Sequence, residues 1–211
     1  TPLTAIIGYL ETIQSGAITN QEETKKFIDI ILKQAERLNR LVEDLLTISN
    51  IETKQTVLNF ESVSLRKAID TMLSLIEAKA ELKNISVRNN VSDNFPPITA
   101  NRDRLTQIFV NILDNAVKFT PNGGEISINA SESGSYTVVS IQDSGIGVPK
   151  DDISRLGERF YRVDKSRSRD LGGTGLGLSI VKHLMIAHGG RMEIESQPGK
   201  GTKVSLYFPV K

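Results

Sequence analysis

A regular stripe of apolar residues is the feature that most constrains how this chain can fold. Between residues 20 and 53, where we predict one long helix, apolar side chains recur at alternating intervals of three and four residues: Ile28, Ile31, Ala35, Leu38, Val42 and Leu45. This is the a/d spacing of helices that pack together in a coiled coil or bundle. A shorter helix with its own apolar stripe is predicted over residues 1–14. The two helices together predict an antiparallel hairpin.

The combined apolar face of this hairpin is too wide for two helices to bury between them. We therefore expect two copies of the chain to pair through their N-terminal helices as a homodimer with a four-helix bundle. The alternative, a hairpin that packs on the rest of its own chain, stays open at this point.

Composition narrows the class of protein further. Lys and Arg total 26 against 25 Asp and Glu, a net charge of +1, which argues against a nucleic-acid partner held by a basic surface. The absence of cysteine excludes disulfides, cysteine-ligated metals and a thiol nucleophile. The longest uncharged stretch, residues 171–181, is about half as long as a membrane-spanning helix. We expect a soluble piece without a membrane segment.

The rest of the chain mixes strand and helix periods, and 211 residues allow two domains, so we predict domains at 1–55 and 56–211. The predicted strands are 58–63, 85–91, 125–131, 136–143, 191–196 and 203–208, and the predicted helices are 64–82, 102–119 and 173–187. Helices grouped against a mixed or antiparallel sheet form an α/β sandwich. The predicted fold class is α+β, a helical hairpin followed by this sandwich.

Helix 102–119 presents two amides and an ammonium on one face. Asn111, Asn115 and Lys118 lie within about 60° of one another around the helix axis. Amide oxygens and a lysine suit Mg²⁺ together with phosphate, because Mg²⁺ prefers hard oxygen ligands that it shares with a nucleotide. The alternative interpretation is an ordinary solvent-exposed polar face.

Two glycine-rich segments follow. The run from Asp143 to Gly147 comes directly after strand 136–143, so a carboxylate stands beside backbone that a flat ring can approach. The exocyclic amine of adenine needs such an acceptor, although Asp-Ser-Gly is also common in turns. The run from Gly172 to Ser179 opens the last helix with glycines whose N–H groups suit an anion. It is not a Walker A loop, because no Lys-Ser/Thr pair follows the glycines.

The order and spacing of these segments resemble the sequence boxes of sensor histidine kinases. Residues 107–120 are similar to the N box, 143–147 to the G1 box, 159–162 to the F box and 173–178 to the G2 box. Residues 98–211 thus resemble the catalytic domain of that family, which has the Bergerat ATP-binding fold shared with gyrase, Hsp90 and MutL. The first 50 residues resemble its dimerisation and phosphoacceptor domain. The run from Thr1 to Thr4 resembles the end of the H box, which would place the acceptor histidine four positions before Thr1.

The resemblance implies a role for each matching residue. The implied catalytic residues are Arg162, which would meet the γ-phosphate electrostatically, Asn111 on the phosphate side, and Thr1, which would orient water for dephosphorylation of a partner. Asn115 would bind Mg²⁺. The implied nucleotide-binding residues are Asn111, Asn115, Lys118, Phe119, Asp143, Gly145, Gly147, Tyr161, Arg162, Gly173, Thr174, Gly175, Leu176 and Gly177.

Within that set, Lys118 would contact the phosphates and Asp143 would accept a hydrogen bond from the adenine amine. The family often has Tyr where this chain has Phe119, so stacking is kept and a hydroxyl contact is lost. The G2 glycines would let the long loop 144–172 close over the triphosphate, and we expect this loop to be mobile without nucleotide and ordered by it. Its basic residues, Lys165, Arg167 and Arg169, are either solvated or in contact with nucleotide or partner.

The function implied by the resemblance is that of a cytoplasmic histidine kinase core, with ATP and Mg²⁺ as cofactors. It would pass the γ-phosphoryl group to a histidine and then to an aspartate of a response regulator receiver domain, and would also dephosphorylate that regulator. The parent protein is expected to be anchored in the bacterial membrane. A gyrase- or Hsp90-like ATPase and a catalytically silent ATP-binding scaffold remain alternatives. The two histidines, His183 and His188, lack the H-box context, and His188 is expected to cap a helix.

Overall fold

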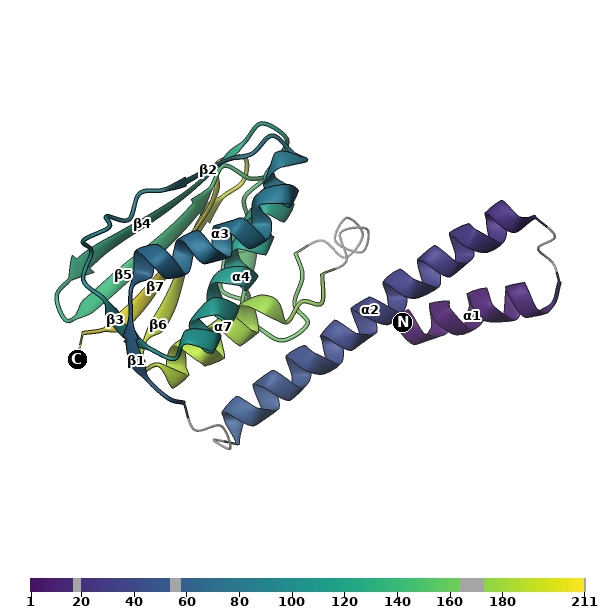
Figure 1. The fold of residues 1–211 in the computed structure, drawn as a ribbon, viewed down its shortest axis with the longest axis horizontal. Coiled ribbons are helices and arrows are strands. Elements are labelled where there is room, and N and C mark those ends of the chain that lie inside the picture. Colours follow the sequence, from purple (N-terminus) through teal and green to yellow (C-terminus); the bar gives the residue numbers. More distant parts are fainter. Residues whose placement is uncertain (17–19, 54–57, 164–172, 211) are drawn as a thin grey trace.

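The hairpin is the first part of the computed structural model, which describes residues 1–16, 20–53, 58–163 and 173–210. Helices α1 (Pro2–Gln14) and α2 (Gln21–Glu52) run antiparallel, with α1 lying along one half of the longer helix (Figure 1). Asn20 caps α2, because its side chain accepts a hydrogen bond from the backbone N–H of Glu22 at 2.9 Å. The predicted hairpin is confirmed.

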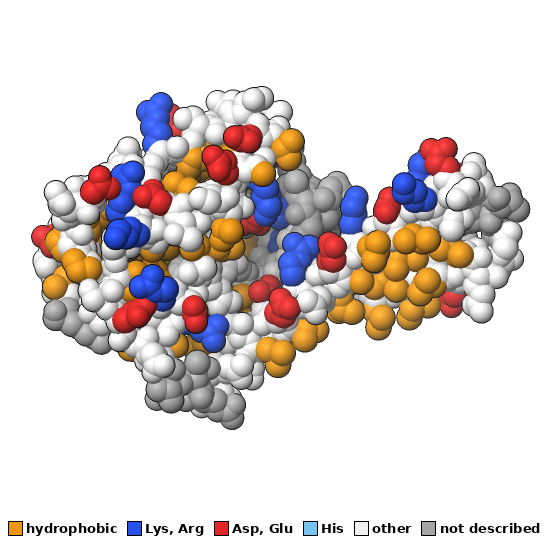
Figure 2. Space-filling view, viewed as in Figure 1, with side chains coloured by type: hydrophobic (Ala, Val, Ile, Leu, Met, Phe, Trp, Pro, Cys, Tyr) orange, Lys and Arg blue, Asp and Glu red, His pale blue; other side chains and the backbone are white. Residues whose placement is uncertain are grey.

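The apolar face of the hairpin is largely uncovered. No residue of α1 is buried, and Ile48 is the one described side chain of α2 that is fully buried. The large apolar side chains that are 42–56% exposed here are Leu3, Ile7, Leu10, Ile28, Leu32, Val42, Leu45 and Leu46. Figure 2 shows apolar side chains gathered as a patch on the hairpin. This is the surface that the sequence predicts to pair with a second copy.

A five-stranded sheet with the order β2-β4-β5-β7-β6 forms the centre of the second part. Its strands are β2 (Ser86–Asn89), β4 (Glu125–Ser133), β5 (Tyr136–Asp143), β6 (Arg191–Gln197) and β7 (Gly201–Pro209). Neighbouring strands are antiparallel except for β2, which runs parallel to β4. Two short strands, β1 (Glu61–Val63) and β3 (Ile98–Ala100), form a separate antiparallel pair.

Three helices, α3 (Leu65–Glu81), α4 (Arg102–Phe119) and α7 (Gly177–Ala187), cover one face of the sheet (Figure 1). The core lies between the two layers, where Phe109 of α4 and Phe208 of β7 are each 1% exposed. The predicted α+β class, a helical hairpin followed by a sandwich, is confirmed. A fourth helix, α5 (Lys150–Ile153), is short and follows the first glycine-rich segment.

Several predicted boundaries are wrong. The last helix begins at Gly177 rather than Gly173, because Gly175 has φ +76° and lies against the backbone of Phe160, a conformation that no helix contains. The strands expected over 58–63 and 85–91 are shorter, Glu61–Val63 and Ser86–Asn89. The sequence pattern predicts neither β3 nor α5, because segments of 3 and 4 residues show no period.

His188 ends α7, as the sequence predicts, and it is 3% exposed. Its Nδ1 lies 2.8 Å from the carbonyl oxygen of Leu184, and its Nε2 accepts a hydrogen bond from the backbone N–H of Asn101 at 3.2 Å. An accepting Nε2 leaves Nδ1 as the donor, so the ring is neutral. The ring also packs edge-on against Phe60 and Phe208. His188 therefore joins α7 to the start of α4 and to the core.

The hairpin meets the sandwich at the C-terminal half of α2. Ile48 is 2% exposed, and Leu41 and Ile51 pack beside it against the core of the second domain. The alternative left open above, a hairpin that packs on its own chain, therefore holds for the C-terminal end of α2. The rest of the apolar stripe stays uncovered.

Candidate functional site

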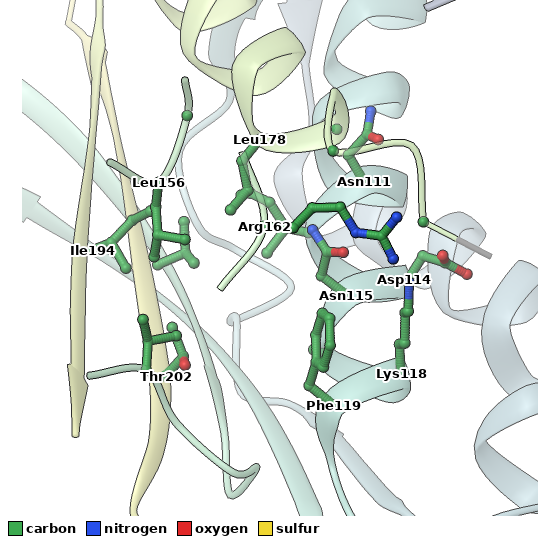
Figure 3. A pocket seen from close by; sticks show the side chains of 18 of the residues that line it. Asn111, Asp114, Asn115, Lys118, Phe119, Leu156, Arg162, Leu178, Ile194 and Thr202 are labelled. Atoms are coloured by element: carbon green, nitrogen blue, oxygen red, sulfur yellow. The ribbon is translucent and has the colours of Figure 1, made fainter. Parts of the chain in front are cut away.

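A cavity of about 520 Å³ lies between α4, the segment after β5 and the turn before α7 (Figure 3). Its wall includes every residue of the predicted nucleotide-binding set except Gly145 and Leu176. Residues from four separate segments of the sequence, the N, G1, F and G2 boxes, therefore meet at one site. α2 also reaches the cavity, through Arg40 and Asp44.

α4 supplies the polar wall. The Asn111 side chain donates to the carbonyl oxygen of Gln107 at 2.9 Å. Its amide oxygen lies so close to Gly177 that a Cβ on this glycine would be only 2.8 Å from it. Asn115 points into the cavity (Figure 3), and no described residue forms a hydrogen bond with its side chain. Its amide oxygen is therefore available to a ligand.

The donor set is compatible with Mg²⁺. Among the residues that the structure describes, no group of three His, Cys, Asp or Glu could hold a metal ion by itself. A cation at Asn115 would thus have one amide oxygen from the chain and would complete its shell with phosphate oxygens and water, as Mg²⁺ does in nucleotide sites.

Asp143 stands at the opposite end of the cavity. One carboxylate oxygen accepts hydrogen bonds from the backbone N–H groups of Gly145 at 2.8 Å and Thr202 at 3.2 Å. Burial raises the pKa of Asp143, and these two hydrogen bonds offset part of that rise. No described residue bonds the second oxygen, which is therefore free to accept from an amine.

Glycines bring backbone close to this carboxylate. A Cβ on Gly145 would lie 2.6 Å from Oδ1 of Asp143, and one on Gly147, at φ +67°, would lie 2.0 Å from the carbonyl oxygen of Gln197. Any other residue would push the wall apart. Gly145 does not line the cavity itself, but it holds the carboxylate of Asp143 in place.

Lys118 and Arg162 bring positive charge to the cavity, across from Thr202, whose N–H donates to Asp143 (Figure 3). Burial lowers the pKa of Lys118, and the nearby charge of Arg162 lowers it further. The Lys118 ammonium also lies 5.2 Å from the ring centre of Phe119, so the aromatic ring and the ammonium share this wall. A site that raises the free energy of its own cations favours an anionic ligand.

The segment before α7 is held by backbone contacts. The N–H of Phe160, a residue at φ +63°, donates to the carbonyl oxygen of Gly175 at 3.0 Å. Thr174 accepts from the N–H of Leu176 at 3.2 Å and donates to the carboxylate of Asp44 at 3.0 Å. Leu176 is fully buried and lies behind the cavity wall, so its part in nucleotide binding would be to support this turn.

Tyr161 and Leu178 also face the cavity. The Tyr161 hydroxyl donates to the carboxylate of Asp152, and this hydrogen bond raises the pKa of Tyr161. Leu178, the last residue of the G2 box, is partly exposed and lines the cavity.

Thr1 lies outside the cavity. It caps α1, and its hydroxyl oxygen accepts from the N–H of Thr4 at 3.3 Å. The basic residues Lys165, Arg167 and Arg169 belong to the part of the expected closing loop, residues 164–172, that lies outside the described residues. The residues that the sequence patterns miss are Arg40 and Asp44, because no local signal connects α2 with a turn 130 residues later.

Comparison with known proteins identifies the family. Residues 100–211 match the family described as histidine kinase-, DNA gyrase B- and HSP90-like ATPase, and residues 1–54 match the His Kinase A (phospho-acceptor) domain. The chain belongs to the sensor histidine kinase family. The sensor histidine kinase WalK of Bacillus subtilis is 37% identical over 213 residues, which cover 100% of this chain and 35% of WalK.

A second relative, the phosphate regulon sensor protein PhoR of Pseudomonas aeruginosa, is 38% identical over 99% of this chain and 47% of its own length. The chain therefore spans less than half the length of these two curated relatives. Within the described residues, no helix has the length and apolarity needed to span a membrane.

Solved structures have the same architecture. The Acinetobacter baumannii histidine kinase AdeS aligns with a TM-score of 0.83 at 24% identity, over 100% of this chain and 96% of AdeS, which shows the shared fold. Full-length ShkA in complex with AMPPNP aligns with a TM-score of 0.76 at 28% identity, over 99% of this chain and 43% of ShkA. Histidine kinase ThkA, in complex with the response regulator protein TrrA, has a TM-score of 0.79 at 25% identity, over 100% of this chain and 58% of ThkA.

Proposed function

We propose that this chain binds ATP with Mg²⁺ and transfers the γ-phosphoryl group to a histidine of the dimerisation helices, in the H box expected before Thr1. The observation that carries the proposal is that one cavity is lined both by Asp143, with a free carboxylate oxygen beside Thr202, and by Lys118 and Arg162, which lie across the cavity from Thr202 in Figure 3. A nucleotide has the matching polarity, with an amine donor on its base and negative charge on its phosphates. The AMPPNP complex of ShkA supports this assignment.

In this proposal the residues of the chain bind and orient the nucleotide. Asp143 accepts from the adenine amine, and the ring of Phe119 packs beside the base. Lys118 and Arg162 offset phosphate charge, which is the main task of a phosphoryl-transfer site. Asn115 holds Mg²⁺, with Asn111 beside it, and the bound cation neutralises charge that develops on the phosphates.

The hairpin supplies dimerisation and phosphotransfer. We assign residues 1–55 to this domain and 56–211 to the catalytic domain. The exposed apolar face of α1 and α2 supports a homodimer through a four-helix bundle. The complex of ThkA with a response regulator supports a receiver domain as the next phosphoryl acceptor. Dephosphorylation of that regulator through Thr1, and a membrane anchor in the parent protein, stay predictions.

Labelling with γ-³²P-ATP and Mg²⁺ tests the proposal. The assay compares residues 1–211 with a chain extended at its N-terminus through the expected H box. We expect acid-labile, alkali-stable label in the extended chain only, and its loss in the Asn115→Ala variant. Asn94→Ala is the matched control, because that side chain is exposed on a loop and does not line the cavity.

Two other results would contradict the proposal. Binding of ATP by both chains without label would favour an ATP-binding scaffold or an ATPase, and phosphate release would separate these two. Label that resists Asn115→Ala would remove the assigned metal ligand from the mechanism.

A further inference from the structure

α2 carries two arginines beside the phosphate end of the cavity. Arg40 forms part of the cavity wall. Arg37, one turn earlier, donates from Nη2 to the carbonyl oxygen of Gly173 at 3.5 Å. Gly173 in turn lies so close to Lys118 that a Cβ on it would be 2.7 Å from the lysine Nζ. The guanidinium of Arg37 and the ammonium of Lys118 therefore meet at the same glycine.

These charges act on one another. The positive charges of Arg37 and Arg40 contribute to the lowered pKa of Lys118, after burial and Arg162. Four cations from three elements thus converge at one end of a single cavity. Figure 2 shows Lys and Arg side chains at the hollow between the hairpin and the larger domain. Like charges held together in this way favour a polyanionic ligand.

Two acidic groups lie near this cluster and offset part of its charge. Asp114 pairs with Lys79 and also raises the pKa of Lys118, against the effect of the arginines. Asp44 accepts a hydrogen bond from Thr174; burial raises its pKa, and the charge of Arg40 opposes that rise. The Nε of Arg37 is buried and has no hydrogen-bond acceptor among the described residues. A buried donor without an acceptor is costly, so the cluster lacks an anion.

We propose that Arg40, with Arg37 behind it, is a phosphate-binding group that α2 supplies to the nucleotide site. The site then spans both domains, and the phosphate tail of the nucleotide joins the catalytic domain to the phosphoacceptor helices. Asp44 opposes this contact, because its carboxylate lines the same cavity and repels phosphate oxygens. The inference rests on the proposed nucleotide site and adds residues from outside the catalytic domain to it.

Calorimetric titration of residues 1–211 with ATP, ADP and adenosine, each with Mg²⁺, tests the inference. Arg40→Gln should weaken ATP binding about tenfold, which is the worth of one charge-assisted hydrogen bond. It should weaken ADP binding less and leave adenosine binding unchanged. Asp44→Asn, which still accepts the hydrogen bond from Thr174, should strengthen ATP binding.

Arg37→Gln is the second variant, with a smaller loss of ATP affinity expected. Lys25→Gln is the matched control, because it removes one positive charge from α2 about 22 Å further along the helix. Circular dichroism at the titration temperature confirms that each variant is folded.

The outcomes separate the two proposals. If the unaltered chain binds none of the three ligands, the proposed nucleotide site is wrong. If it binds ATP but Arg40→Gln has no effect, or weakens adenosine and ATP equally, the phosphate contact is wrong. If Arg40→Gln and Asp44→Asn both weaken ATP binding, these residues merely hold the domains together, and the inference is overturned.

Discussion

The sandwich buries most of its apolar side chains within one chain, whereas the helical hairpin leaves most of its apolar face exposed. Side chains of α3, α4 and α7 are buried against the sheet, and Leu105, Ile108 and Leu206 are each at most 1% exposed. α1 has no buried residue, and most of the apolar stripe of α2 remains in contact with solvent. The sandwich therefore buries its apolar surface within one copy, whereas the hairpin leaves a face that the proposed dimer would cover.

A charge in the uncovered stripe should have the largest effect on this difference. Ile28→Glu places a carboxylate where the dimer would bury an apolar side chain, at a cost of several kcal/mol. We expect the chain to become a monomer by sedimentation while its affinity for ATP is unchanged. Lys33→Glu, on the polar side of α2, is the control and should remain a dimer. A dimeric Ile28→Glu variant would show that the dimer forms elsewhere.

A cavity in the core of the sandwich should lower the stability of the sandwich and leave the hairpin dimer unchanged. Phe109 is 1% exposed, so Phe109→Ala should destabilise the sandwich by about 3–5 kcal/mol. In urea, the unfolding of the sandwich should move to lower concentration while sedimentation below that range still reports a dimer. Leu82→Ala, at a side chain that is 84% exposed, should change little. Loss of the dimer in Phe109→Ala would show that the two domains depend on each other.

Lys83 should have an intermediate effect, because it bonds the C-terminus of α4, the helix that carries the amides Asn111 and Asn115. Its Nζ donates to the carbonyl oxygens of Val117 at 2.8 Å, Lys118 at 2.9 Å and Thr120 at 2.9 Å. Lys83→Met should destabilise the sandwich by about 2 kcal/mol, since three carbonyls lose a charged donor. The free energy of unfolding from urea titration measures this.

Lys79→Met is the control for Lys83→Met. It removes an ion pair between two exposed side chains, Lys79 and Asp114, which is worth less than about 1 kcal/mol. Equal losses of unfolding free energy in the two variants would show that the three carbonyl hydrogen bonds contribute no more than an exposed ion pair.

The smallest effect on stability, and one of opposite sign, is expected at Asp143. Burial raises the pKa of this carboxyl in the folded state, so its negative charge destabilises the fold at neutral pH. Asp143→Asn should be slightly more stable at pH 7, and its advantage should shrink as the pH falls through the raised pKa and vanish below the ordinary pKa of aspartic acid. ATP binding should nevertheless weaken, because an amide presents one acceptor oxygen. Urea titrations of both chains across pH 3–7 measure the difference, and a pH-independent difference would contradict the assigned cause.

The sequence predicts the helices well because their signals are local and repeated. The spacing of Asn111, Asn115 and Lys118 places them on one face of α4, and the structure brings this face to Asp143 and to the turn before α7. The start of α7 could not be predicted, because the conformation of Gly175 depends on contact with Phe160. The same holds for Arg40 and Asp44, whose place in the cavity depends on how two domains meet.

The close backbone contacts around Asp143 also have a consequence for inhibitors. Gly201 lies so near that a Cβ on it would be 1.9 Å from the carbonyl oxygen of Asp143. A small molecule anchored at this end would meet a wall built of main chain, which cannot change rotamer to accommodate it. A group that extends to Arg40 would instead meet a long side chain from α2, which can change rotamer. Tight fit can therefore be designed at the Asp143 end of the cavity, and adaptable contacts at Arg40.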